Sequence, residues 1–139
     1  MSSLKVPVIA VITGEGNSGG ALAIAVANSV LMFEHAVYSI LSPEGFASIL
    51  YKDASQSANA CEAMKMTASD LYEFGMIDRI IREPAEGMQA DWAGAFRETD
   101  RVLRKELSKY DGLTPLAIAK HRYHKFRRID ENKIMTRNV

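Results

Sequence analysis

The stretch from Val6 to Ala27 joins an apolar segment, a glycine-rich segment and an uncharged segment. Residues 6–13 are apolar on both faces and rich in β-branched side chains, which predicts a buried strand of a parallel or mixed sheet. Residues 14–20 contain four glycines and predict a loop, and residues 21–27 predict a helix packed tightly on most sides. A strand, a glycine loop and a helix start together bring backbone N–H groups and partial positive charge to one point, where an anion is favoured.

Strands and helices are also predicted along the rest of the chain. Further strands are expected over residues 29–34, 36–41 and 77–81, and helices over residues 46–51, 54–64, 69–74, 90–110 and from Thr114 onward. Thr67 and Asp70 resemble a capping pair, and Gly75 suits a left-handed helix end. The expected apolar stripes of the last two helices are Trp92, Phe96, Thr99, Leu103, Leu107 and Tyr110, then Leu116, Ala119, Tyr123 and Phe126. Residues after Asp130 predict a frayed tail.

Composition narrows the function classes. The 139 residues carry 17 basic and 17 acidic side chains, so bulk charge favours neither nucleic acid nor an anionic membrane. The longest apolar run, residues 6–12, is too short to span a bilayer, and the N-terminus lacks a signal-peptide layout. The single cysteine, Cys61, excludes an intrachain disulfide and a cysteine-rich zinc site built from this chain alone. A soluble, cytoplasmic setting is expected.

The glycine segment has three interpretations. Gly14, Gly16 and Gly19 fit a dinucleotide-binding fingerprint with Glu34 as the ribose acid, but Glu34 leads directly into another strand where that fold needs a crossover helix. A P-loop is excluded, because no Gly-Lys-Ser/Thr ends the segment. The glycines alternatively serve only a tight turn and close packing, or they form an oxyanion hole.

Several linked runs resemble one family, the α subunit of bacterial acetyl-CoA carboxylase carboxyltransferase. The resemblance covers nearly the whole chain, and its runs are residues 6–8, 14–24, 38–50, 62–64, 77–84 and 122–126. It implies an α/β fold of the crotonase type, a spiral of β-β-α units, with two C-terminal helices. The chain is then a single domain over residues 1–139, with a core over about 1–88 and a helical extension over about 89–130. The family's subunit is about twice this long, so the chain looks like its C-terminal half.

The resemblance also implies a reaction and a site. The family transfers a carboxyl group from carboxybiotin, on a carrier protein, to acetyl-CoA, giving malonyl-CoA for fatty acid synthesis. Backbone N–H groups of Gly19 and Gly20, with Ala21 beside them, are implied to stabilise the ureido oxygen of biotin. The loop residues Gly16, Asn17 and Ser18 are implied to lie near carboxybiotin, although Asn17 stands where the family usually has glycine; Asn tolerates positive φ better than most residues.

The implied partners are a β subunit and the biotin carboxyl carrier protein. The β subunit is implied to hold most of the CoA and a zinc site, while no metal is expected on this chain. Homo-association is expected, within a family assembly of two α and two β subunits. The isolated chain is expected to be inactive, and neither a membrane nor nucleic acid is an expected partner.

Other residues have alternative roles. Glu15 or Glu44 would be the acid or base if the chain were a crotonase-type hydratase or isomerase, but solvated carboxylates are the preferred interpretation. Cys61 is expected to be a buried small hydrophobe, His35 a turn residue, and His121 with His124 no metal site. The basic segment over residues 120–128 predicts a packed helix with a solvated basic face, with CoA phosphates, a carrier protein or nucleic acid as alternative partners. A noncatalytic assembly module is the remaining alternative function.

Overall fold

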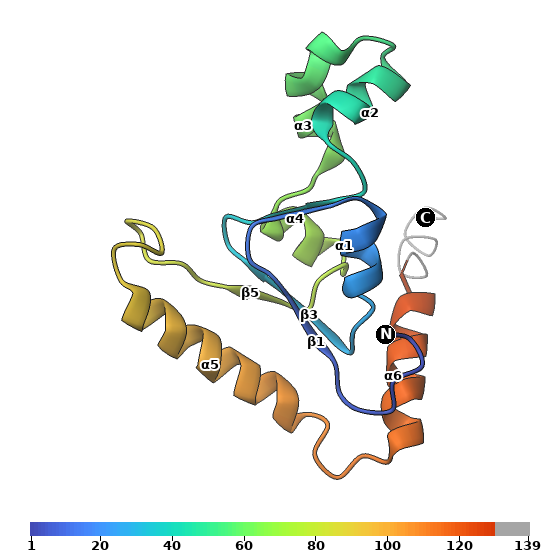
Figure 1. Cartoon of the computed structure of the whole chain (residues 1–139), viewed down its shortest axis with the longest axis vertical. Coiled ribbons are helices and arrows are strands. Elements are labelled where there is room, and N and C mark those ends of the chain that lie inside the picture. The colour runs from blue at the N-terminus through green and yellow to red at the C-terminus, as the bar shows by residue number, and fades with distance from the viewer. Residues whose placement is uncertain (130–139) are drawn as a thin grey trace, which may run out of the picture.

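The computed structural model describes residues 1–129 and repeats one structural unit, two strands followed by a helix (Figure 1). The first unit is β1 (Ile9–Ile12), β2 (Glu15–Asn17) and α1 (Ser18–Ile24). The second unit begins with β3 (Ser29–Phe33) and β4 (Val37–Ser39). The last strand is β5 (Arg79–Ile81). The predicted strands are all present, each shorter than its apolar run.

The strands form two parallel sheets. One has the order β1-β3-β5, and the other pairs β2 with β4. Successive first strands therefore stack in one sheet and successive second strands in the other, so the chain winds as a spiral and the predicted β-β-α architecture is confirmed. The turn between β3 and β4 contains His35, as predicted, and leaves no room for the crossover helix of a dinucleotide-binding unit.

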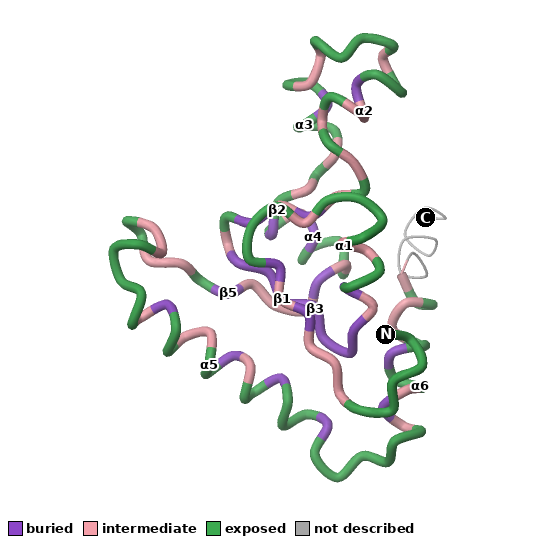
Figure 2. Tube along the Cα trace, in the orientation of Figure 1, coloured by how far each residue is buried: buried purple, intermediate pink, exposed green. Residues whose placement is uncertain are grey.

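The core lies around β3, the central strand of the larger sheet. All five β3 residues are buried, whereas β1 alternates between buried and partly buried positions because it lies at the sheet edge (Figure 2). Helix α1 has no buried residue, and Ile24 is 67 % exposed. The prediction of a first helix packed on most sides is therefore wrong: Ala21 and Leu22 pack partly against the core, while Ala23 and Ile24 are exposed.

The helices of the second unit lead away from the sheets. Helices α2 (Pro43–Leu50) and α3 (Ser57–Met64), with a 3-10 turn over Ala54–Gln56, project from the body as an arm (Figure 1). Helix α4 (Ala68–Glu73) returns the chain to the core. Its predicted cap is confirmed, because Thr67 Oγ1 accepts a hydrogen bond from the Asp70 N–H, and Gly75 has a φ of +70°. Cys61 is exposed on α3, so its predicted burial is wrong.

The last two helices, α5 (Trp92–Ser108) and α6 (Pro115–Arg127), lie where the sequence predicts them. Their buried faces match the predicted stripes only in part. Tyr110 is buried and Leu103 packs against the core, as predicted, whereas Trp92, Phe96, Leu107, Leu116 and Tyr123 are exposed. The fully buried residues within the helices are Ala95, Val102 and Glu106 on α5 and Ile118 and Arg122 on α6. The inward faces are therefore shifted from the predicted ones, and each includes a charged side chain.

Both buried charges have complete hydrogen bonding. Glu106 accepts from Arg79 Nε at 2.9 Å, Lys109 Nζ at 2.6 Å and Ser29 Oγ at 3.0 Å. Arg122 donates to Asn28 Oδ1 and to the carbonyl oxygens of Met1, Ser2, Leu4 and Val6. Ser29 begins β3 and Asn28 precedes it, so this network holds α6 and the C-terminal end of α5 near the amino end of β3. A buried charge is stable only when it is paired in this way.

Within residues 1–129, no helix is both long enough and apolar enough to cross a membrane. The predicted frayed tail falls after Asp130 and so lies outside the described residues.

Candidate functional site

The glycine-rich segment is more ordered than its sequence predicts. After β1 the chain bends at Gly14, runs as β2 and enters α1 at Ser18. The predicted loop over residues 14–20 is therefore a short strand and the first turn of a helix, and the helix begins three residues earlier than expected. The loop was predicted because glycine has a low helix propensity. In the structure, the pairing of β2 with β4 instead sets the residue at which the helix begins.

The first turn of α1 presents unpaired backbone donors. The first N–H groups of a helix, here on Ser18, Gly19 and Gly20, have no intrahelical acceptor, and no side chain caps this helix. Asn17, the N-cap residue, instead accepts a hydrogen bond from Ser39 Oγ at 2.7 Å. The N–H of Ala21 is the first with an acceptor four residues back. The turn thus offers donors and partial positive charge to a negatively charged oxygen.

The glycines of this segment differ in what surrounds them. A Cβ placed on Gly19 or Gly20 would meet nothing within 4 Å, so close packing does not require these two glycines. A Cβ on Gly16 would lie 3.3 Å from Ile12 Cγ2 and 3.3 Å from Tyr38 Cδ2. Packing therefore explains Gly16, whereas Gly19 and Gly20 keep the helix start open to a ligand.

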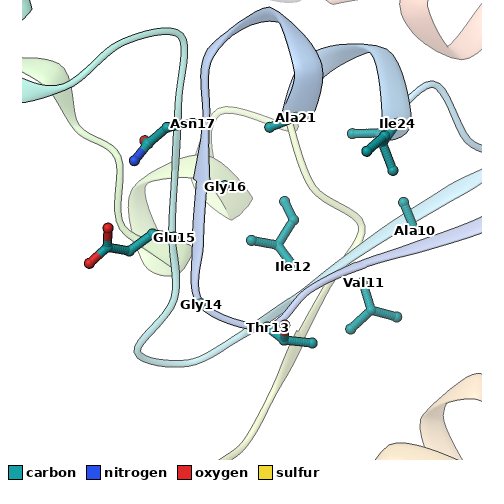
Figure 3. Close-up of a pocket in the computed structure, with 11 residues that line it drawn as sticks. Ala10, Val11, Ile12, Thr13, Gly14, Glu15, Gly16, Asn17, Ala21 and Ile24 are labelled. Carbon is teal, nitrogen blue, oxygen red and sulfur yellow. The ribbon is translucent and has the colours of Figure 1, made fainter.

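A cleft of about 380 Å³ lies between β1, β2 and α1 (Figure 3). Its wall includes Gly16, Asn17 and Ala21, together with Ile12 and Ile24. Ser18, Gly19 and Gly20 do not line it; they are exposed at the adjoining helix start, between Asn17 and Ala21 in the chain. The structure thus places all six predicted residues at one strand-to-helix junction, three in the cleft wall and three in the helix start.

Ser18 is the feature of this junction that the sequence did not reveal. Its φ is +69°, in the left-handed region that non-glycine residues rarely adopt, whereas Asn17 is extended with a φ of −117°. The expectation that Asn17 needs a tolerance for positive φ is therefore wrong, and Ser18 takes that conformation one residue later. Strained backbone of this kind concentrates at functional sites, and serine carries no special propensity that would have signalled it.

The two carboxylates considered as acid or base lie outside the cleft wall or point away from its apolar side. Glu15 is exposed on β2, and Figure 3 shows its carboxylate directed away from Ile12, Ala21 and Ile24. Glu44 is exposed in the first turn of α2. These positions are those of solvated carboxylates, although on a strand and a helix rather than on loops. Among residues 1–129, no three His, Cys, Asp or Glu side chains are placed to hold a metal ion.

A comparison with solved structures identifies the fold. Transcarboxylase 12S, in a structure described with methylmalonyl-coenzyme A and methylmalonic acid bound, has a similar architecture with a TM-score of 0.59. The alignment covers 78 % of this chain and 21 % of that chain at 22 % identity, so it shows the fold alone. The chain has the predicted crotonase-like fold.

The family follows from sequence. The chain belongs to the acetyl co-enzyme A carboxylase carboxyltransferase-like family, whose sequence profile matches residues 1–130. The acetyl-coenzyme A carboxylase carboxyl transferase subunit alpha of Rhizorhabdus wittichii is 50 % identical over 124 residues, covering 89 % of this chain and 40 % of the relative. The subunit of the same name from Clostridium acetobutylicum is 51 % identical over 133 residues, 93 % of this chain and 47 % of the relative. The chain thus spans less than half the length of these two relatives, and the resemblance stated from sequence is confirmed.

Proposed function

We propose that this chain is the part of a carboxyltransferase α subunit that stabilises negative charge on the carboxyl donor. The donor is carboxybiotin on a carrier protein, the acceptor is acetyl-CoA and the product is malonyl-CoA. The observation that carries the proposal is the uncapped start of α1, where Gly19 and Gly20 leave open space beside backbone donors. Family membership supports the reaction class.

The proposed role of the chain follows from this geometry. Loss of the carboxyl group leaves negative charge on the ureido oxygen of biotin. The N–H groups of Gly19 and Gly20 donate to that oxygen, and the positive end of the α1 dipole stabilises it further. Gly16, Asn17 and Ala21 line the adjoining cleft, which admits the biotin ring, while Ser18 holds the bend that aims the donors. Decarboxylation would release CO2, the biotin anion would take the methyl proton of acetyl-CoA, and the resulting enolate would capture the CO2 to give malonyl-CoA, so neither Glu15 nor Glu44 would be required as a base.

The partners in this proposal are a β subunit, the carrier protein and a further copy of the α subunit. The β subunit supplies zinc and most of the acetyl-CoA site. An apolar cleft of about 530 Å³ lined by Val11, Phe33, Trp92 and Phe96 supports association, because it leaves large apolar side chains open to solvent. We also propose that residues 1–139 form one domain, divided near residue 88 into core and helical extension, that works in the cytoplasm. The chain alone is expected to be inactive.

Carboxyl transfer in the assembled enzyme tests the proposal. Gly20→Val is expected to reduce the rate about a hundredfold or more, because a branched side chain blocks the backbone donors. The matched control is Ala23→Val, on the same helix and absent from the cleft wall, which should leave the rate within about threefold of wild type.

Circular dichroism and urea unfolding establish that both variants fold. A folded Gly20→Val enzyme with wild-type turnover would contradict the charge-stabilising role and leave the helix start without a catalytic function.

A further inference from the structure

A second cleft lies along α6, near the amino end of β5. The glycine segment lies at the other end of the strands, after the carboxyl end of β1. The cleft has a volume of about 380 Å³, and α6 supplies His121, His124 and Lys125, followed by its C-cap residue Arg128. These positions are three, four and seven residues apart, so they form one row on the helix face. Asp78 completes the wall from just before β5.

The single acid that lines this cleft, Asp78, is paired with a cation of the cleft. Asp78 Oδ2 accepts hydrogen bonds from Lys125 Nζ and from the Val30 N–H. The Lys125 side chain is only 13 % exposed, and its Nζ also lies 3.4 Å from the Asn28 carbonyl oxygen. The ammonium group is thus held in a fixed place, and Asp78 is not available to bind a metal ion.

The protonation of His121 can be assigned from its neighbour Asn28. Asn28 Oδ1 accepts from the Val8 N–H and from Arg122, so the amide nitrogen must face the other way, where it donates to the Ile118 carbonyl at 2.9 Å. That nitrogen lies 3.4 Å from His121 Nδ1. Nδ1 therefore acts as the acceptor in the neutral ring, and Nε2 carries the proton and serves as a donor.

The electrostatics of the cleft favour an anion. With both histidines neutral, Lys125 and Arg128 outweigh Asp78 by one positive charge, and each protonated histidine adds another. Burial lowers the pKa of His121, Lys125 lowers it further, and Asp78 opposes both. The other charged or titratable groups that face His121 are Lys109 and Tyr110, which follow the end of α5, and Arg122 on α6. A bound anion would remove this repulsion between cations.

We propose that the α6 cleft binds a phosphate dianion, either free or as the terminal monoester of a larger ligand. Several N–H donors on one side of the cleft match a tetrahedral anion with three terminal oxygens better than they match a planar carboxylate. The net positive charge of the cleft favours an anion, and the cleft volume leaves room for the rest of a monoester.

The first test uses nuclear magnetic resonance of the histidine ring protons in the complete chain. Inorganic phosphate, titrated at constant ionic strength, is expected to shift the His121 and His124 signals saturably and to leave the His35 signal unchanged. His35 is the internal reference because it lies in the β3–β4 turn. Equal small shifts at all three histidines, or no shift at millimolar phosphate, would overturn the proposal.

Further probes identify the source of the phosphate. AMP and CoA each carry a phosphomonoester, whereas dephospho-CoA carries only the diphosphate. Tighter binding of CoA than of dephospho-CoA supports a CoA monoester as the ligand, and binding of AMP alone supports a nucleotide. Binding of inorganic phosphate with rejection of all three supports the free ion.

Two arginines at the end of α6 provide a matched pair of variants. Arg128 lines the cleft and Arg127, its exposed neighbour, does not. Arg128→Gln is expected to weaken phosphate binding about tenfold, because it removes a charge-assisted donor. Arg127→Gln should change the affinity less than about twofold. Equal losses would show a general effect of helix charge and overturn the proposed cleft.

The pH dependence is tested with sulfate, whose charge does not change near neutrality. Protonation of His121 adds a cation to the cleft, so sulfate should bind more tightly at pH 5.5 than at pH 8. If the anion raises the pKa of His121 by one unit, the protonated form binds about tenfold more tightly. Affinity that does not depend on pH, or that falls on acidification, would contradict a role for His121.

Discussion

Two regions of the molecule, the start of α1 and the buried network at the amino end of β3, are built in opposite ways. At the carboxyl end of β2, the helix start of α1 consists of backbone donors and open space, with no side-chain cap. At the amino end of β3, Asn28, Arg122 and Glu106 are buried and fully hydrogen-bonded. Side chains added at the helix start are expected to change stability little and to reduce activity. Substitutions in the buried network are expected to lower stability, with less direct effect on the site.

The largest expected effect on stability is at the amino end of β3. Arg122→Met should lower the free energy of unfolding by about 3 kcal/mol, because it leaves Asn28 Oδ1 and several carbonyl oxygens without their donor. Arg127→Met, on the exposed face of the same helix, is the control. Urea unfolding measures both. An Arg122→Met chain as stable as the control would show that the network does not stabilise the amino end of β3.

Glu106 gives this region a dependence on pH. Burial raises the pKa of Glu106, but hydrogen bonds from Lys109, Arg79 and Ser29 outweigh it, and the pKa lies below its ordinary value. The ionised carboxylate therefore stabilises the fold above its ordinary pKa, and that stability is lost as the pH falls through the lowered value. Glu106→Gln should cost about 2 kcal/mol at pH 7.

The same variant should lose less stability than wild type between pH 5 and pH 3. Unfolding curves at several pH values check this difference, and parallel pH profiles for the two chains would show that Glu106 is not the titrating group.

Two glycines at the junction of β2 and α1 are expected to respond differently to substitution by alanine. Gly16→Ala should destabilise the fold by about 1 kcal/mol, because its Cβ presses on Ile12 and Tyr38. Gly20→Ala should stabilise it by up to about 0.5 kcal/mol, because alanine favours helix and meets open space. Thermal unfolding measures both changes in stability. A loss for Gly16→Ala and a gain for Gly20→Ala would confirm that packing constrains only Gly16, and changes of the same sign would contradict it.

The smallest expected effects are at the two exposed carboxylates. Glu15→Gln and Glu44→Gln should each keep carboxyl transfer within about tenfold of wild type, since neither is needed as a base. A loss above a thousandfold in either variant, measured in the assembled enzyme, would favour hydratase-type chemistry and contradict the proposed mechanism.

The spiral was predicted through the resemblance to the carboxyltransferase α subunits, and the two strands in close succession around Glu34 were consistent with it. The run of glycines directed the site prediction to the junction of β2 and α1, and the role of that junction stays a prediction. The sequence predicted the inward faces of α5 and α6 only in part, because Glu106 and Arg122 look like solvated charges until their distant partners are known. The left-handed Ser18 was hidden for a related reason: tertiary pairing of β2 with β4, rather than local propensity, sets that bend.

Arg122 also bears on the order in which the chain acquires its native contacts. Its bonds to Met1, Leu4 and Val6 join residues 121, 118 and 116 positions apart in sequence. During synthesis, β1 and β3 emerge long before Arg122 leaves the ribosome, so the amino-terminal strand pairs first without this anchor. Contacts of such long range close large loops and form slowly. The docking of α6 onto residues 1–6 is therefore expected to occur after the pairing of β1 with β3.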